Sequence, residues 1–201
     1  TRNKGKNWFI TKWGDFKLND IHMLNSQRGF IASDGGILLS TENGGRDWNV
    51  IDTKDVSINF KTIEFFENKG IATGTKGRVY ITEDGGLNWA LMTIEESKRK
   101  NKLVDLNAVN IINKNNIWIA GNDGVLLHST DGGITWKQNR FKEYNYYSVK
   151  FLNENEGFIG GENGNYIHTT NGGIIWKTDK LPAYKINRFI SSGNTLWAIG
   201  N

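Results

Sequence analysis

Several features are scarce or missing in this chain of 201 residues. It has no cysteine, which excludes a disulfide framework, a thiolate nucleophile and a cysteine-ligated zinc. No apolar run approaches the roughly 18 residues of a membrane-spanning helix, so we expect no membrane span. Proline occurs once, at Pro182, whereas there are 24 glycines and 8 tryptophans. The aromatic content excludes a disordered chain.

The charge of the chain is only mildly positive. Lys and Arg number 25 against 21 Asp and Glu, which gives a formal net charge of +4. These charges are spread along the chain and form no basic stripe. A small and dispersed excess of this kind does not indicate a nucleic-acid partner, and we expect none.

One motif of eight residues, Ser/Thr-x-Asp/Asn-x-Gly-x-x-Trp, occurs five times. Its polar residue and its tryptophan are Asn3 and Trp8, Asn43 and Trp48, Asp84 and Trp89, Asp131 and Trp136, and Asn171 and Trp176. The glycine permits a positive φ, and the Asp or Asn side chain can accept hydrogen bonds from the amides of a tight turn. The tryptophan can anchor that turn on a sheet. We therefore expect a structural role and no metal, since neutral Asn, at three of the five positions, is a poor calcium ligand.

Each motif lies within a unit of about 40 residues that also contains short apolar or alternating segments. Four short strands in a repeated unit of this length predict an all-β fold, a β-propeller of four-stranded antiparallel blades. We expect one domain over residues 1–201, with complete blades at about 17–56, 57–99, 104–143 and 145–182. A terminal blade from 183–201 plus 1–14 would close a five-bladed ring. The alternative is a part of a larger propeller of about seven blades.

The segment 157–176, which reads GFIGGENGNYIHTTNGGIIW, carries the repeat most fully. It resembles the Asp-box (BNR) repeat, and the chain as a whole is most similar to the photosystem II stability/assembly-factor family. That resemblance implies a non-catalytic propeller that binds a protein partner without a cofactor, and it favours a periplasmic or extracellular location. Sialidases and some glucanases share the box, so a glycoside hydrolase and a carbohydrate-binding propeller remain the alternatives.

Two sets of residues are candidates for binding. The innermost strand of each blade offers one polar position between apolar neighbours, and a ring around the channel would consist of His22, Glu64, Asn110, Lys150 and Arg188. Arg188 reaches that position only if the turn after it is shorter by one residue. The second set lies on two neighbouring links between blades, Lys98, Arg99, Lys100, Arg140, Tyr144, Tyr146 and Tyr147. Arg and Tyr are favoured at protein interfaces, so this loop patch is a candidate contact surface.

Evidence for catalysis is weak. A sialidase needs three arginines around a carboxylate, a Tyr–Glu pair and an acidic group. The seven arginines here are scattered over different strands and turns, and only Arg188 is expected on an inner strand. His128 and His168 occupy equivalent positions in neighbouring blades, but no third ligand recurs there, so we expect packing or hydrogen bonding from them. No catalytic residue is predicted.

Overall fold

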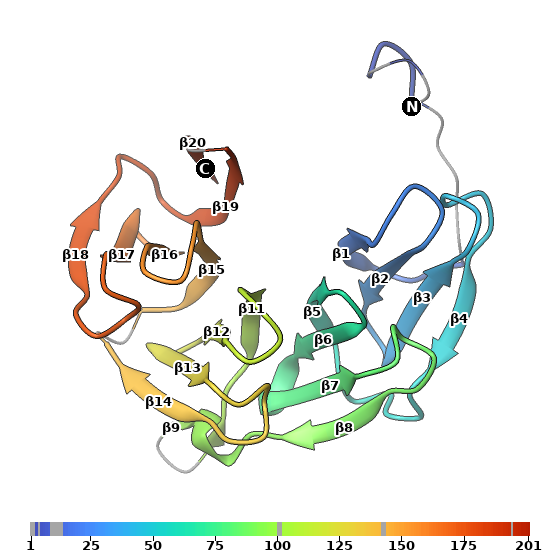
Figure 1. Cartoon of the computed structure of the whole chain (residues 1–201), viewed down its shortest axis with the longest axis horizontal. Coiled ribbons are helices and arrows are strands. Elements are labelled where there is room, and N and C mark those ends of the chain that lie inside the picture. The colour runs from blue at the N-terminus through green and yellow to red at the C-terminus, as the bar shows by residue number, and fades with distance from the viewer. Residues whose placement is uncertain (1–2, 4, 9–13, 100–101, 142–143, 194) are drawn as a thin grey trace.

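The computed structural model describes residues 3, 5–8, 14–99, 102–141, 144–193 and 195–201 (Figure 1). Four antiparallel four-stranded sheets follow one another along the chain. They are β1 (Leu18–Met23), β2 (Gly29–Ser33), β3 (Ile37–Thr41) and β4 (Asn49–Asp52); β5 (Phe60–Phe66), β6 (Lys69–Gly74), β7 (Arg78–Thr82) and β8 (Ala90–Thr93); β11 (Leu106–Ile111), β12 (Ile117–Gly121), β13 (Val125–Ser129) and β14 (Lys137–Arg140); and β15 (Tyr146–Phe151), β16 (Gly157–Gly161), β17 (Asn165–Thr169) and β18 (Lys177–Lys180). A two-stranded sheet of β19 (Ile186–Ser192) and β20 (Thr195–Gly200) ends the described chain.

The remaining elements are short and lie in turns and links. A 3-10 turn, η1 (Thr75–Gly77), joins β6 to β7. The link between the second and third blades contains η2 (Glu95–Ser97) and the small ribbon of β9 (Lys98–Arg99) and β10 (Lys102–Leu103). No helix in the described ranges is long and apolar enough to cross a membrane.

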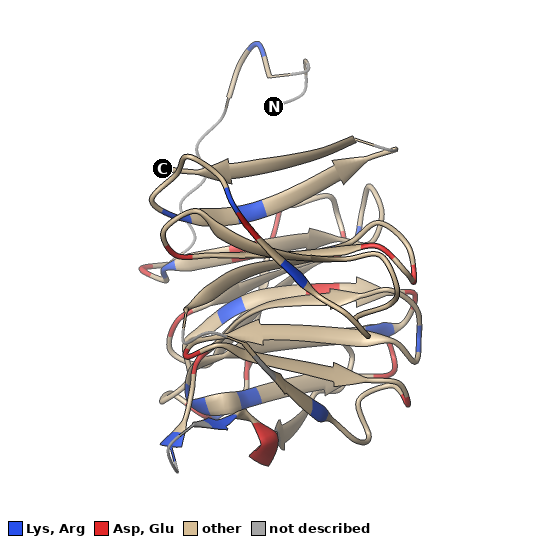
Figure 2. Cartoon of the chain, turned by 90° about the vertical axis from the view of Figure 1, so that its left-hand side faces the viewer, with Lys and Arg blue, Asp and Glu red and all other residues tan. Residues whose placement is uncertain are grey.

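The sheets are arranged as the blades of a β-propeller. The first strands β1, β5, β11, β15 and β19 lie around the centre, and the last strands β4, β8, β14 and β18 lie outside, so that the blades form an arc (Figure 1). We call the four strands of a blade A to D from the inside outward. Lys and Arg are mixed with Asp and Glu on the side that Figure 2 shows, and no element there carries a stripe of one sign. The all-β propeller predicted from the repeat is confirmed.

The two ends of the arc are the first blade and the β19–β20 pair. The described part of the N-terminal segment extends beyond the first blade and away from β20 (Figure 1). Residues 9–13, which would supply the outer strand of a terminal blade built from 183–201 plus 1–14, lie outside the described residues. The division into blades and the closure of a five-bladed ring therefore stay predictions.

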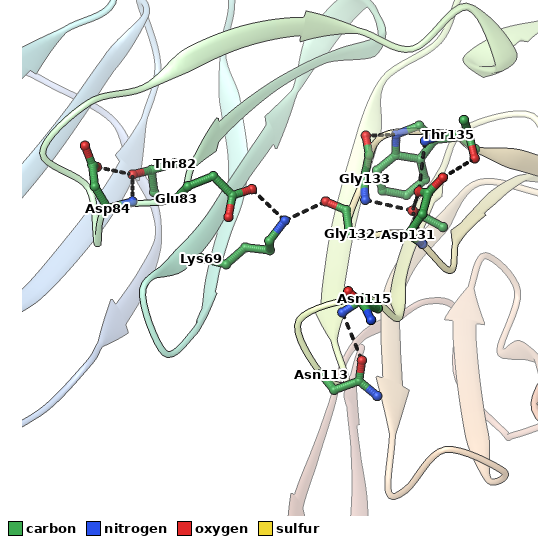
Figure 3. Close-up of polar contacts among 12 residues, drawn as sticks. Lys69, Thr82, Glu83, Asp84, Asn113, Asn115, Asp131, Gly132, Gly133 and Thr135 are labelled. Atoms are coloured by element: carbon green, nitrogen blue, oxygen red, sulfur yellow. Dashed lines mark hydrogen bonds and ion pairs between the residues drawn. The ribbon is translucent and has the colours of Figure 1, made fainter.

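The turn motif forms the hairpin between strands C and D and is stabilised by its own side chains. In the third blade, the Ser129 hydroxyl accepts a hydrogen bond from the Gly133 N–H at 2.8 Å and donates one to the Asp131 carboxylate at 2.8 Å. Asp131 also accepts the N–H of Thr135 at 2.9 Å (Figure 3). The same two bonds recur in the other three complete blades. There the motif glycine donates its N–H to the Thr hydroxyl, and the fourth residue after the Asp or Asn donates its N–H to the side-chain oxygen of that Asp or Asn. The Trp89 and Trp136 indoles each donate to the carbonyl of the motif glycine.

Hydrogen bonds to the turn lower the pKa of the exposed Asp84 carboxyl from 3.8 to about 2, and those from Asn88 are the main cause. A carboxyl whose pKa falls on folding stabilises the fold above its unfolded pKa. We therefore expect this contribution to be complete above pH 4 and to be lost as the pH falls towards 2. Asp84→Asn keeps the acceptor oxygen that three other motifs use, so it should fold normally but show a smaller loss of stability between pH 4 and 2. Urea unfolding followed by circular dichroism measures the difference, and an unchanged pH dependence would contradict it.

Neighbouring blades pack through side chains of strands A and B and the tryptophan of the following turn. Trp118 on β12 stacks on Phe151 of the next blade at 5.2 Å and meets Trp176 edge-on at 5.6 Å. Phe30, Phe65 and Trp89 repeat this arrangement between the first two blades. Aliphatic side chains take the same places between the second and third blades, where Ile71 and Ile111 belong to one buried cluster with Trp136. The core thus lies between blades, which explains why strand B is apolar at successive residues.

Candidate binding site at the centre of the propeller

A cavity of about 540 Å³ lies at the centre of the arc, among the inner strands. The second residue of every inner strand lines it, so it lies toward the ends where the links from the preceding blades enter. Its titratable lining groups come from four of the five inner strands and one link; they are Asp20, His22, Lys61, Glu64, Tyr147, Lys150, Lys185 and Arg188. A smaller cavity of about 350 Å³ lies at the other end of β11 and β15, and Glu64, Asn110 and Lys150 line it.

Asn110 connects three blades beside this centre. Its side-chain N–H donates to the Glu64 carboxyl on β5 at 2.8 Å, and its carbonyl oxygen accepts the Phe151 N–H on β15 at 2.7 Å. Asn110 is buried and both polar atoms of its side chain are engaged, so it positions Glu64. Burial raises the pKa of Glu64 to about 7, although the Lys150 ammonium and the Asn110 hydrogen bond both act to lower it.

The register of the terminal strands corrects the predicted position of Arg188. Ile190 pairs with Trp197 as Asn110 pairs with Trp118, so Ile190 occupies the fifth ring position. Arg188 comes two residues earlier, directly after the bulge that each inner strand contains, where the first blade has Asp20. The connection from Ile190 to Trp197 is one residue shorter than that from Asn110 to Trp118, and this shortening brings Ile190, not Arg188, to the ring position. Arg188 nevertheless lines the larger cavity together with His22, Glu64 and Lys150.

Arg188 forms an ion pair that links the two ends of the arc. Its guanidinium donates to the carboxylate of Asp20 on β1 at 2.8 Å, and the Asp20 side chain is almost fully buried. The other Asp20 oxygen accepts the Thr62 hydroxyl at 2.8 Å and the Ile63 N–H at 3.2 Å. Asp20 is thus fully engaged by the neighbouring chain segments. Sequence inspection missed it, because its position holds Thr62, Ala108 and Ser148 in the other complete blades and shows no common chemistry.

His22 faces the cavity from β1 and packs near the ring of Phe65, with 5.7 Å between ring centroids. Burial lowers its pKa from 6.5; the Asp20 carboxylate opposes this shift, while Arg188 and Lys150 reinforce it. His22 is consequently neutral at pH 7 and can act as a hydrogen-bonding group there.

The structure separates the members of the loop patch. Tyr146 is buried between the third and fourth blades, which corrects its expected place on the surface. Tyr147 faces the central cavity instead, where its hydroxyl donates to Glu162 at 3.2 Å and the Lys185 ammonium lies 3.7 Å from its ring centroid. Lys98 is exposed and forms an ion pair with Glu95, while Tyr144 is half-buried. Lys100 lies outside the described residues, as do the side chains of Arg99 and Arg140.

The two equivalent histidines are held by aromatic stacking. His128 lies parallel to Trp118 with 3.7 Å between ring centroids, and its Nε2 is 2.9 Å from the Asn116 side-chain oxygen. Burial lowers the pKa of His128 to about 4. His168 stacks on Phe158 at 4.3 Å. Within the described ranges, no group of three His, Asp or Glu side chains is arranged to hold a metal ion.

Repeated asparagines that the sequence analysis did not single out fix the inner strands to one another. The Asn19 and Asn107 side chains each donate to the carbonyl of the first residue in the next inner strand, Phe60 or Tyr146, at 2.6 and 2.8 Å. Each also donates to a polar side chain in its own blade, Asp34 or Asn122, at 2.7 Å. Both asparagines follow a leucine at the start of strand A, and that recurrence was a usable signal.

Comparisons of sequence and of structure both find similarity to Ycf48 proteins. The family model described as "Photosynthesis system II assembly factor YCF48" matches residues 53–144. A photosystem II assembly lipoprotein Ycf48 from a Synechococcus species is 26% identical over 122 residues, which cover 59% of this chain and 35% of the relative. The Ycf48 protein of a Nostoc species is 25% identical over 171 residues, covering 64% of this chain and 50% of the relative. The chain thus spans a third to a half of the length of these curated relatives.

Solved structures with the same architecture include YCF48 proteins and enzymes. A structure entitled "YCF48 bound to D1 peptide" superposes with a TM-score of 0.72 at 15% identity, covering 95% of this chain and 65% of that one. YCF48 from Cyanidioschyzon merolae gives 0.68 at 17% identity over 92% of this chain and 64% of its own. An ancestral GH74 enzyme gives 0.66 at 16% identity over 81% of this chain and 25% of its own, and these identities establish the fold alone. The chain is an Asp-box (BNR) repeat β-propeller similar to the Ycf48 photosystem II assembly factors.

Proposed function

We propose that this chain is a non-catalytic propeller that binds a polypeptide partner and assists the assembly of a protein complex. The observation that carries the proposal is the central cavity, whose lining comes from five successive inner strands and whose charged side chains are mostly cationic. Its relatives are named as assembly factors, and one similar protein was solved with a D1 peptide. A peptide of D1, or of the corresponding subunit of another complex, is the partner class that we propose for this chain.

The proposed contact surface extends from the cavity to the links between blades. His22, Glu64, Lys150, Arg188 and Tyr147 line the cavity, and Asn110 supports them from behind. The exposed Lys98 of the second link, with Arg99 and Lys100 beside it in the sequence, provides positive charge for steering a partner. Tyr146 is not included because it is buried.

The geometry does not favour hydrolysis. Retaining glycosidases place two carboxyl groups about 5 Å apart on either side of the scissile bond. The two acidic residues that line the cavity, Asp20 and Glu64, are instead occupied by Arg188 and Thr62 and by Asn110. Asp20 has both carboxyl oxygens engaged, so it cannot serve as the second free carboxyl group beside Glu64.

We expect the purified chain to bind a D1 peptide, or a subunit that it captures from native extract and that is then purified, with a saturable micromolar or tighter Kd. Changing Lys98, Arg99 and Lys100 together to alanine should weaken this binding several-fold and reduce its salt dependence, because exposed cations act mainly through screened attraction. Lys114→Ala, an exposed lysine on the opposite set of turns, is the matched control. Calorimetry measures each Kd. Failure of both ligand types to bind, or measurable hydrolysis of sialosides or β-glucans, would overturn the proposed function.

A further inference from the structure

The charges around the central cavity are unbalanced. Lys61, Lys150, Lys185 and Arg188 face only two acidic residues, Asp20 and Glu64. Asp20 is neutralised by Arg188 and is buried against Thr62 and Ile63. In the part of the chain that the structure describes, Lys61, Lys150 and Lys185 form no ion pair with a carboxylate, although Lys185 helps to lower the pKa of Glu162, which lies outside the cavity lining. The cavity therefore carries cationic groups without matching anions of its own.

Glu64 is the one acid that faces Lys150 in both cavities. It is a weak counter-charge, because burial raises the pKa of Glu64 to about 7 and its carboxyl is therefore partly protonated at neutral pH. The side-chain N–H of Asn110 donates to one carboxyl oxygen, Oε1, in either protonation state. Lys150 is consequently left with a partner that carries less than a full negative charge.

Resting on the proposed function, we propose that the cavity holds a carboxylate of the partner polypeptide against Lys150, and that Glu64 takes up a proton from solvent as this carboxylate binds. An incoming anion next to Glu64 disfavours its charged form, so the site gains a proton and keeps its positive potential. Binding and protonation are therefore coupled in both directions.

Features of the cavity favour a polypeptide as the source of the anion. Its volume of about 540 Å³ lies within the range of roughly 300–1,000 Å³ typical of ligand pockets, and it is larger than a single small anion needs. The link 181–185 contains Tyr184, which is 85% exposed, directly before the cavity residue Lys185. An exposed tyrosine next to a cationic pocket suits a chain that inserts a carboxylate and continues over the rim.

Other groups near Glu64 set the pH range in which the coupling can be observed. The larger cavity is faced by Asp20 and His22 on β1, Lys61 on the strand of Glu64, Tyr147 and Lys150 on β15, and Lys185 and Arg188 around β19. Glu154 lines the smaller cavity with Glu64. Burial lowers the pKa of His22 from 6.5. Measurements between pH 7 and pH 8.5 therefore follow Glu64 while His22 stays neutral.

The experiment is calorimetric titration of the intact chain with a capped tetraglutamate peptide, in two buffers of different ionisation enthalpy. We expect uptake of up to about half a proton at pH 7 and an affinity several-fold lower at pH 8.5. Glu64→Gln should bind equally well at both pH values with no proton uptake. Lys150→Gln should weaken binding by about tenfold or more. Lys177→Gln, which removes the same charge from the exposed strand β18, should bind like the wild type.

Each remaining outcome counts against the inference. Binding that is independent of pH, or that survives Lys150→Gln, would overturn it, as would equal binding of capped tetraglutamine. Inorganic phosphate that displaces the peptide at the concentration at which phosphate itself saturates the chain would identify a site for free anions instead. If the D1 peptide or captured subunit binds while the Glu64 and Lys150 variants behave like the wild type, this inference fails and the proposed function stands.

Discussion

Trp118→Ala is expected to lower the free energy of unfolding by about 3–5 kcal/mol, the usual cost of removing a buried aromatic side chain. Trp118 is 1% exposed and contacts three other aromatic rings, those of His128, Phe151 and Trp176. Phe151 and Trp176 belong to the next blade, so the substitution opens a void between blades. Urea unfolding followed by far-UV circular dichroism measures the change without relying on the tryptophan signal.

Trp197→Ala is the matched control for this effect. Trp197 occupies the same register position in the terminal sheet, pairing with Ile190 as Trp118 pairs with Asn110. No further blade covers it among the described residues, and it is 47% exposed. We expect a loss of about 1 kcal/mol or less. Equal losses at the two positions would show that the stabilisation provided by Trp118 does not come from packing between blades.

The sequence was sufficient to predict the architecture because the fold is built from a repeated local device. The hydrogen bonds of each turn motif connect residues no more than four positions apart, as Ser129, Asp131 and Gly133 show. Five copies of such a pattern reveal strands, hairpins and their order without information about distant contacts. The polar position of strand A was likewise visible in His22, Glu64, Asn110 and Lys150, because it recurs at the same place in each unit.

The chemistry of the centre was less predictable because it depends on contacts between blades. Asp20 and Arg188 are 168 residues apart, and neither shares a residue type with its equivalents in the other units. Tyr146 and Tyr147 are adjacent in sequence, yet Tyr146 lies in the core whereas Tyr147, the extra residue of the bulge in β15, faces the cavity. A repeat therefore predicts well where equivalent residues lie in each blade. It predicts poorly what the side chains do at positions where the units differ.

Gly173→Ala is expected to cost about 1–3 kcal/mol more than the same change at Gly45, which holds the equivalent position in the first turn motif. Both glycines have positive φ, +82° and +80°, so both substitutions carry the same backbone strain of about 1–2 kcal/mol. They differ in their surroundings, since a Cβ on Gly173 would lie 2.4 Å from Cη2 of Trp118, whereas the nearest atom to one on Gly45 is its own Trp48 at 3.4 Å.

The extra cost at Gly173 arises because Trp118 projects from the third blade under the fourth turn and is held there by its stacking on His128 and Phe151. Gly45 has no such neighbour, since no blade precedes the first one among the described sheets. Overpacking against a rigid ring costs about 1–3 kcal/mol. The double variant Trp118→Ala with Gly173→Ala removes this clash, so its loss of stability should be smaller than the sum of the single losses by that amount. Strict additivity in urea unfolding would contradict the contact. A shortfall of the expected size would show that each turn motif is shaped to receive the aromatic side chain of the preceding blade.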